Sequence, residues 1–379
     1  MRDAMVALAR RGIASVALVH RHGLSLRTQE EIFTASGYKF PLTRTALWAR
    51  FLFTPISPGF PWRLRKIIRT AKPDILHLHM PNASVFWALL LPSARRIPWV
   101  VHWHADVVTS AQGRWMKLFY KLYQPFEYAV LKRATSIVAT SLPYQETSQP
   151  LKQWLSKCYV VPLGVDTERY SATTSSKNAN GDVAPPDPST TPTLQVLAVG
   201  RLTYYKGFRY LIEAAAQVPG IHINLVGRGE LTEELKEQAA SLGLQEKVSF
   251  LSTLSDEELA HQMKTCDCLC LPSIERTEAF GMVLLEAMYF GKATIIGDVK
   301  GSGMGWVVDD GVTGIKVKPA DADALAGAIN RLATDRSELA DMGKRGKEKF
   351  SRQFEINHAV EGLVSVYKLT KNNHEQTVN

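Results

Sequence analysis

Two glutamates, Glu278 and Glu286, lie in the stretch ERTEAFGMVLLEAMYFGKATI. On one continuous α-helix they would be about 12 Å apart along the axis and about 80° apart around it, so they could not share a proton or a metal ion. Gly281 between them is a poor residue for a helix interior, whereas Met282–Phe290 favours a helix that Gly291 ends. We therefore expect Glu278 in a loop and Glu286 in the second turn of the helix that follows.

The start of this helix would present backbone N–H groups around Phe280, Gly281, Met282 and Val283. A helix N-terminus favours an anion such as phosphate. Glutamates on either side of a bound anion can each hold a group rich in hydroxyls. A sugar beside one glutamate and a ribose beside the other would fit this arrangement.

A second candidate anion site is VGRLTYYKGF, in which the end of a predicted strand supplies Arg201 and Lys206 before the next helix. Two fixed cations beside a helix N-terminus suit a diphosphate, because arginine forks over oxygen atoms and lysine acts as a point charge. Cations after strands are common, so this feature gains specificity only together with the two glutamates.

The composition indicates a large globular protein. A chain of 379 residues exceeds one ordinary core and predicts two domains. The longest apolar runs are too short to span a bilayer, and no secretory signal is recognisable. Four cysteines are too few and too clustered for a disulfide framework, which favours a cytoplasmic location. We expect no nucleic-acid partner.

Charge is unevenly distributed. Residues 1–170 hold 23 basic and 9 acidic side chains, whereas residues 171–379 hold 22 and 27. Residues 44–69 interleave cations with aromatics, which suits an anionic membrane surface and equally suits a solvated basic face over core aromatics. The side chains concerned are Arg44, Arg50, Arg63, Arg65, Lys66, Arg69, Trp48, Phe51, Phe53, Phe60 and Trp62.

Segments with strand and helix character alternate along the chain, which predicts an α/β fold with parallel sheets covered by helices. Near Ser171–Thr193 the chain has almost no apolar residues and is rich in Pro, Gly and Asn, which predicts a linker between two doubly wound halves. We expect a first domain over 1–168, the linker over 169–194, a second domain over 195–352, and over 353–379 a helix returning to the first domain followed by a disordered tail.

Predicted strands cover Ser15–Val19, Asp74–Leu78, Pro98–His102, Ser136–Ala139, Cys158–Pro162, Leu194–Val199, Ile221–Val226 and Val248–Leu251. Predicted helices cover Trp62–Thr70, Arg114–Lys132, Phe208–Gln217, Glu230–Leu242 and Asp256–Lys264.

The sequence resembles the retaining glycosyltransferases of family 4, also called group 1 glycosyl transferases. The strings that carry the resemblance are VGRLTYYKG, LVGRGEL, EAFGMVLLEAM and DGVTGIKVKPADADALAGAI in the second half, and PDILHLHMP, VVHWHADVV and VVPLGVD in the first. The resemblance implies the GT-B fold, in which two Rossmann-like domains face each other across a cleft, here an acceptor-side domain over 1–168 and a nucleotide-sugar domain over 195–352. It also implies transfer of a sugar from a nucleotide diphosphate to an acceptor hydroxyl with retention at the anomeric carbon.

The resemblance implies roles for individual residues. Arg201 and Lys206 match the pair that holds the donor diphosphate, and Phe280, Gly281, Met282 and Val283 match the backbone that cradles phosphate. Glu278 matches the glutamate facing the transferred sugar, Glu286 the one on the ribose, and His104 the first-domain histidine near the reacting centre. Cations and helix amides would stabilise the leaving diphosphate, so no metal and no other cofactor is expected.

Three features of the sequence could instead bind a metal ion. The pairs His20/His22, His77/His79 and His102/His104 would each share one face of a strand and could signal a metal hydrolase, although only Asp106 is near as a carboxylate. We favour histidines at strand ends that line a sugar site. The D-x-D at Asp321–Asp323 is interpreted as a helix N-cap, and Cys266–Cys270 as a buried strand.

The start of the chain departs from the family pattern. Family members open with a strand and a glycine-rich loop, whereas MRDAMVALARRGIASVALV is typical of the first helix and second strand, so the opening strand and loop are expected to be missing. The leading hypothesis is a glycosyltransferase on the inner face of the cytoplasmic membrane, acting on a lipid-linked or glycan acceptor in lipopolysaccharide or exopolysaccharide synthesis. The alternatives are a catalytically impaired nucleotide-sugar-binding protein, a sugar-nucleotide epimerase and the metal hydrolase.

Overall fold

The computed structural model describes residues 2–51, 54–107, 113–171 and 193–378. The chain forms two compact units. The first consists of Met1–Pro162 and Ile356–Asn379, and the second of Leu163–Glu355. Most of the predicted linker, residues 172–192, lies outside the described residues, whereas α7 (Glu168–Ser171) is a short helix where that linker was expected to begin.

The second unit contains one six-stranded sheet in which every pairing is parallel, with the strand order β12-β11-β10-β13-β14-β15. Buried hydrophobic runs build it, as expected for a sheet covered on both faces. The predictions for the first three strands of this unit coincide with the observed bounds. The strands are β10 (Leu194–Val199), β11 (Ile221–Val226), β12 (Val248–Leu251), β13 (Cys268–Leu271), β14 (Ala293–Gly297) and β15 (Gly314–Val317).

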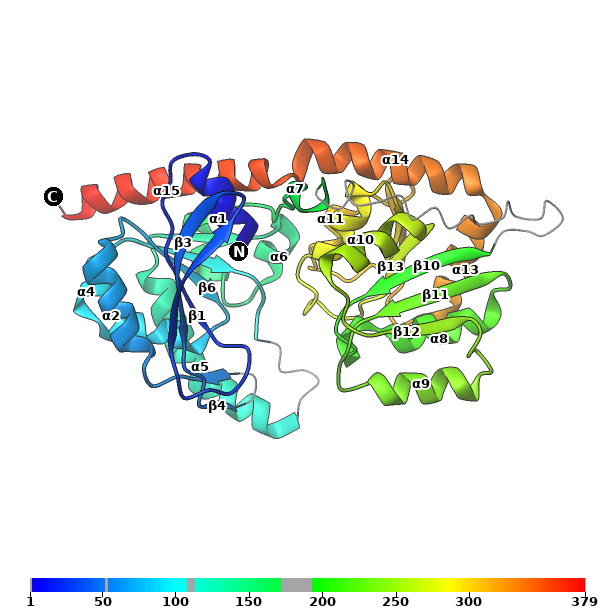
Figure 1. Cartoon of the computed structure of the whole chain (residues 1–379), viewed down its shortest axis with the longest axis horizontal. Helices are drawn as coiled ribbons and strands as arrows, with labels where there is room; N and C mark the ends of the chain where they lie inside the picture. The colour runs from blue at the N-terminus through cyan, green and yellow to red at the C-terminus, as the bar shows by residue number, and fades with distance from the viewer. Residues whose placement is uncertain (1, 52–53, 108–112, 172–192, 379) are drawn as a thin grey trace. The chain divides into compact units, whose positions relative to one another are not determined.

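Helices cover both faces of this sheet, above and below it in Figure 1. Alternate strand residues point to opposite faces, so Val196 and Ala198 join one core and Leu197 joins the other. The first core is closed by α8 (Phe208–Gln217), α9 (Thr232–Ser241) and α13 (Ala322–Thr334). The second is closed by α10 (Asp256–Thr265), α11 (Met282–Tyr289), α12 (Met304–Val307) and α14 (Arg336–Gln353).

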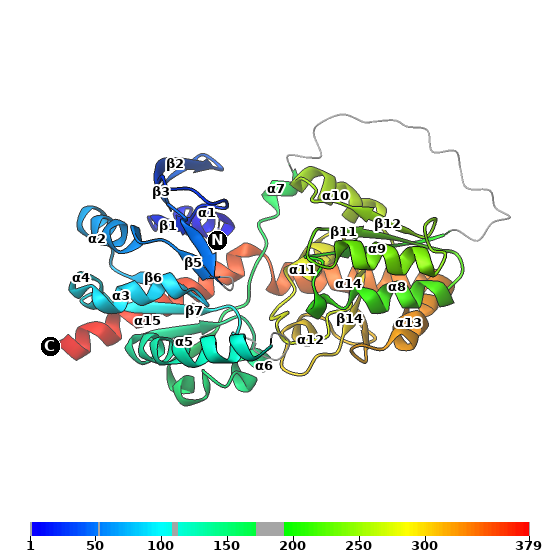
Figure 2. The ribbon, with the colours of Figure 1, turned by 90° about the horizontal axis from the view of Figure 1, so that it is seen from below.

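The first unit holds a four-stranded parallel sheet with the order β6-β7-β8-β9. Each of these strands lies within two residues of its predicted position. Figure 2 shows the strands β1 to β3 on one side of β6 and β7 and the helix α5 on the other. The elements are β6 (Leu76–Met80), β7 (Trp99–Trp103), β8 (Ser136–Ala139), β9 (Cys158–Val160), α2 (Phe60–Ala71), α3 (Trp87–Leu90), α4 (Pro92–Arg95), α5 (Gly113–Arg133) and α6 (Leu142–Thr147).

Beside its parallel sheet the first unit contains antiparallel strand pairs, which the sequence did not predict. Strands β2 (Gln29–Ala35) and β3 (Tyr38–Thr45) form a hairpin, and β1 (Ala17–His20) pairs in parallel with β3. Ser36 and Gly37 make the turn with φ of 46° and 79°, the left-handed pair that a two-residue hairpin loop requires. A second, shorter antiparallel pair consists of β4 (Ala49–Phe51) and β5 (Thr54–Ile56).

The helix and strand predicted at the start of the chain are α1 (Arg2–Ala9) and β1. The missing opening strand stays a prediction. The long helix α15 (Ile356–Val378) runs along the first unit (Figure 1), where Leu363 and Val366 pack against Val100 and Val138. No helix within the described residues combines the length and apolar character that crossing a membrane requires.

Candidate functional site

The strand order of the second unit places a binding site at the carboxyl ends of β10 and β13. From β10 the chain continues outward through β11 and β12, and then crosses to β13 on the other side of β10. Ligands of doubly wound sheets bind where the strand order reverses in this way. The loops that follow these two strands carry Arg201 and Lys206 in one case and Glu278 in the other.

The two loops are joined by specific contacts. The N–H of Ile274 donates to the carbonyl of Tyr205 at 2.8 Å. The Nζ atom of Lys206 contacts a carboxylate oxygen of Glu278, and both side chains are largely buried, with 11% and 13% of their surface exposed. The predicted diphosphate lysine and the predicted sugar-facing glutamate therefore meet at one point, 72 residues apart in the sequence.

Arg201 lies beside the same loop but is more exposed, and its Nη2 atom is 3.1 Å from Glu230 Oε2. Glu230 also accepts a hydrogen bond from the Thr203 hydroxyl. Burial raises the pKa of the Tyr205 hydroxyl and the nearby Glu278 carboxylate raises it further, while Arg201 opposes the shift. Sequence reasoning missed Glu230 and Tyr205, although Glu230 belongs to the family string LVGRGEL.

Gly207 allows the two loops to approach each other. It has φ of 68°, and a Cβ atom at this position would lie 2.2 Å from the carbonyl oxygen of Pro272. A side chain would therefore be strained by its backbone conformation and would also push the loop after β13 away from the loop after β10. The short helix Tyr204–Lys206, which carries the site lysine, ends at this glycine.

We expect Gly207→Ala to destabilise the protein more than Gly243→Ala. Gly243 also has φ of 68°, but nothing lies within 4 Å of its hypothetical Cβ, so its substitution should cost about 1–2 kcal/mol through backbone strain alone. The clash with Pro272 should add about 1–3 kcal/mol at Gly207. Urea unfolding followed by far-UV circular dichroism measures both variants. Equal losses of unfolding free energy in the two variants would contradict the close approach of Gly207 to Pro272.

The start of α11 matches its predicted form. Gly281 caps the helix with φ of 78°, and Phe280 before it is buried in the core. The hydroxyl of Ser302 contacts the Glu278 carbonyl and fixes the loop that leads into the cap. The first backbone N–H groups of a helix have no partner within the helix, so those at Met282 and Val283 remain suited to an anion.

Glu286 lies in the second turn of α11, as predicted, with 14% of its side chain exposed. Its Oε1 atom is 2.5 Å from Nη2 of Arg169, and Tyr170 also bonds to the carboxylate. Burial raises the pKa of Glu286, while Arg169 opposes the shift. Arg169 and Tyr170 were not anticipated, because they fall where the sequence predicts a linker.

His104 belongs to the first unit, directly after β7, where its N–H donates to the carbonyl of Met80 at 2.9 Å. The structure places it in a group of four stacked histidines with His77, His79 and His102, which we call the histidine stack. Burial lowers the pKa of His104 to about 4. The imidazole is therefore neutral near pH 7 and can either donate or accept a hydrogen bond.

The other residues considered as metal ligands have different surroundings in the structure. His20 bonds to Thr45 and stacks on Phe60, so this pair does not join the histidine stack. The side chain of Asp321 accepts from the N–H of Ala324 as a helix N-cap, and Cys268 and Cys270 are buried within β13, as predicted. The Asp106 carboxylate accepts hydrogen bonds from Trp103 and Ser148.

Comparison with known proteins identifies the family. A family model described as "Glycosyl transferases group 1" matches residues 186–349, and one described as "Glycosyltransferase Family 4" matches residues 1–169. The O-antigen chain mannosyltransferase C of Escherichia coli is 30% identical over 332 residues, which make up 85% of this chain and 82% of that protein. The chain belongs to the family 4 glycosyltransferases.

Solved structures confirm the GT-B fold of this glycosyltransferase. Sucrose-phosphate synthase from Thermosynechococcus elongatus has a TM-score of 0.75 at 22% identity, covering 97% of this chain and 91% of that one. HepE from Anabaena, solved in complex with UDP-glucose, has a TM-score of 0.62 at 22% identity, covering 86% of each chain. Both likenesses concern the fold, with its two Rossmann-like domains.

Proposed function

We propose that this glycosyltransferase moves a sugar from a nucleoside diphosphate to an acceptor hydroxyl with retention at the anomeric carbon. Lys206, Arg201 and the N-terminus of α11 hold the diphosphate and stabilise its negative charge as the sugar leaves. Glu278 faces the sugar, Glu286 binds the ribose, and His104 lies near the reacting centre. In this proposal transfer requires no metal or other cofactor.

One observation carries the proposal: Lys206 and Glu278 meet beside the start of α11, at the switch point of the sheet. Their opposite charges compensate each other in the structure, where both side chains are largely buried. A donor diphosphate offers Lys206 a more highly charged partner, which leaves Glu278 available for sugar hydroxyls. Binding of the donor therefore exchanges one ion pair for two sets of contacts.

The acceptor is proposed from the relatives. The Escherichia coli relative is named for transfer of mannose to the O-antigen chain, which supports a glycan or lipid-linked acceptor in lipopolysaccharide or a related surface polysaccharide. The UDP-glucose complex of HepE supports a nucleotide-sugar donor for this fold. We place the reaction at the inner face of the cytoplasmic membrane, where nucleotide sugars are available.

The experiment begins with a panel of UDP-, GDP- and dTDP-sugars, scored by protection of the protein against thermal unfolding. The protecting donor is then incubated with lipid-linked oligosaccharide acceptors, and the anomeric configuration of the product is read by NMR. We expect transfer with retention. A product of inverted configuration would refute the mechanism, and donor binding with epimerisation or without transfer to any acceptor would refute the assigned reaction.

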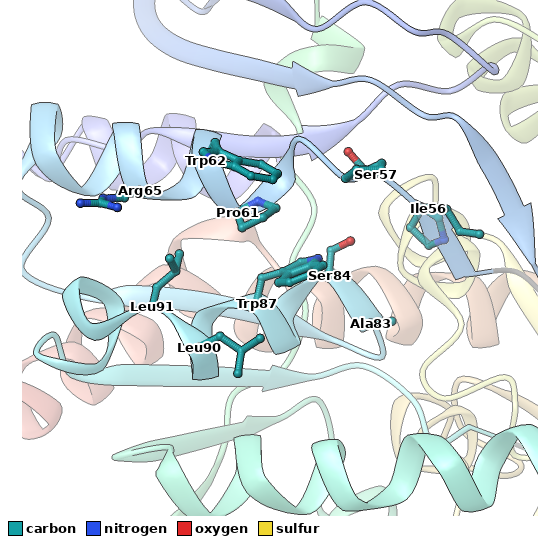
Figure 3. Close-up of a pocket in the computed structure, with 12 residues that line it drawn as sticks. Ile56, Ser57, Pro61, Trp62, Arg65, Ala83, Ser84, Trp87, Leu90 and Leu91 are labelled. Carbon is teal, nitrogen blue, oxygen red and sulfur yellow. The ribbon is translucent and has the colours of Figure 1, made fainter.

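We further propose that the first unit binds an anionic membrane through an apolar groove between α2 and α3. The groove has a volume of about 550 Å³, and Trp62 and Trp87 line it with Leu90 and Arg65 (Figure 3). Trp62 is 70% exposed and Leu90 68% exposed. Exposed tryptophans beside a cation suit the headgroup level of a bilayer that contains anionic lipids.

Only part of the basic aromatic segment supports this surface. Phe60 is a core residue, and Glu30 pairs with Arg63 at 2.7 Å and with Lys66 at 2.9 Å, which reduces the positive charge of α2. Phe53 lies outside the described residues. The groove therefore depends on apolar side chains as well as on Arg65.

We expect Trp62→Ala combined with Arg65→Ser to reduce binding to vesicles of phosphatidylglycerol and phosphatidylcholine at least about tenfold. The double variant loses an interfacial aromatic side chain and one cation, and a cation near an anionic membrane contributes about 1 kcal/mol to the free energy of binding. Flotation with these vesicles measures the bound fraction. Leu242→Ala, at an exposed apolar side chain of the second unit, is the control and should bind like the unmodified chain. Unchanged flotation of the double variant would exclude this groove as the membrane contact.

A further inference from the structure

Three members of the histidine stack, His77, His79 and His102, have no role in the proposed transfer reaction. His77 and His79 on β6 lie beside His102 on β7, because His79 and His102 are register partners in the parallel sheet. The rings are nearly parallel: His77 and His79 are 4.6 Å apart at 13°, and His77 and His102 are 5.3 Å apart at 5°. One ring nitrogen from each of these three can be chosen so that all lie within 4.8 Å of one another.

His79 Nδ1 is 2.7 Å from His104 Nε2, and one deeply buried ring nitrogen of the stack has no partner among the described residues. His77 Nδ1 is 2.6 Å from the Tyr367 hydroxyl of α15, and His77 Nε2 is 3.2 Å from His102 Nδ1. His102 is only 4% exposed, and its Nε2 has no hydrogen-bond partner among the described residues. A buried nitrogen without a partner costs about 1–3 kcal/mol, so this side of the stack is incomplete as it stands.

We propose that His77, His79 and His102 form a binding site for one Zn²⁺ ion that joins β6 to β7. Three neutral imidazoles and one further ligand make a set that zinc accepts in tetrahedral geometry. A Zn–N bond of about 2.0 Å places the ligand nitrogens about 3.3 Å apart. The separations of up to 4.8 Å therefore have to close by about 1.5 Å, and the nearly parallel rings have to turn about their broad χ2 torsions until their lone pairs converge on the ion.

The donor atoms favour a transition-metal ion such as Zn²⁺ over Mg²⁺ or Ca²⁺. The three proposed ligand side chains all offer nitrogen, whereas Mg²⁺ and Ca²⁺ require oxygen ligands. Tyr367 can accept the Nδ1–H of His77 and so hold that ring with its Nε2 lone pair directed into the stack, the kind of support that histidine ligands of zinc receive in proteins. Each ring keeps one N–H when it binds the ion, so no proton has to leave.

The proposed site is tested by metal binding itself, a readout that does not depend on the proposed sugar transfer. Chelator-treated, full-length protein is dialysed against micromolar Zn²⁺ and its bound metal is counted. We expect one equivalent, and a melting temperature higher by about 5–10 °C at a hundredfold excess of zinc over its Kd. Co²⁺ in place of zinc should give the visible absorption of a tetrahedral site without a thiolate band, which excludes binding by the cysteines.

Variants separate the stack from adventitious binding. His79→Asn should lose the equivalent of zinc and the thermal shift, whereas His22→Asn, which alters an exposed histidine of the His20/His22 pair, should keep both. Tyr367→Phe retains all three proposed ligands and should bind zinc more weakly by about tenfold or more. Uptake of zinc by His79→Asn equal to that of the unmodified chain, or no uptake by the folded unmodified chain, would overturn the site.

Discussion

Lys206→Met is expected to lower the rate of sugar transfer by about 10²–10³, the loss seen when one preorganised group that stabilises a developing negative charge is removed. Lys206 is largely buried and contacts Glu278. Its partner in the reaction would be the leaving diphosphate, whose charge grows as the sugar departs. Initial rates at saturating donor, with folding checked by circular dichroism, measure the effect.

A comparison with Glu278→Gln isolates the role of the lysine. If donor and Glu278 compete for Lys206, Glu278→Gln should bind the nucleoside diphosphate product more tightly than the unmodified enzyme, whereas Lys206→Met should bind it more weakly. Both variants should transfer sugar slowly. Lys236→Met, at an exposed residue of α9 that pairs with Glu233 at 3.0 Å, should behave normally. If Glu278→Gln and Lys206→Met change the affinity for the nucleoside diphosphate in the same direction, the proposed exchange of partners is refuted.

The sheet of the second unit could be predicted because its strands are short segments rich in apolar and β-branched residues, bounded by glycine and polar loops. Burial on both faces leaves little freedom for such a segment, and β10, β11 and β12 have the predicted bounds. The β2–β3 hairpin was missed because β2 reads QEEIFTA and exposes most of its side chains, so it lacks an apolar run. Its signal was the Ser36-Gly37 turn between alternating residues.

The candidate site was predictable where its residues follow strands that pair, since the carboxyl ends of β10 and β13 must lie together. The partners that the side chains take in the free protein were not predictable. Arg169 contacts Glu286, which is 117 residues away in the sequence, and no local sequence pattern indicates this pair. The same applies to the histidine stack, whose members converge only once the register of β6 and β7 is known.

Glu286→Gln is expected to weaken binding of the nucleoside diphosphate by about 10- to 100-fold, because hydrogen bonds to a charged group contribute about 1.5–3 kcal/mol. The assigned partner is the ribose, so the 2′,3′-dideoxy nucleotide should bind the unmodified enzyme poorly and lose almost nothing further in the variant.

Burial raises the pKa of Glu286. Protonation therefore begins at a higher pH than for an exposed glutamate, and as the pH falls through that raised pKa the carboxylate and its share of the affinity are lost. Titration calorimetry of both nucleotides from pH 8 downwards should show this acid-side loss in the unmodified enzyme in excess of that in Glu286→Gln. Equal dideoxy penalties in the two proteins would remove Glu286 from the ribose and leave its contact with Arg169 as a purely structural pair.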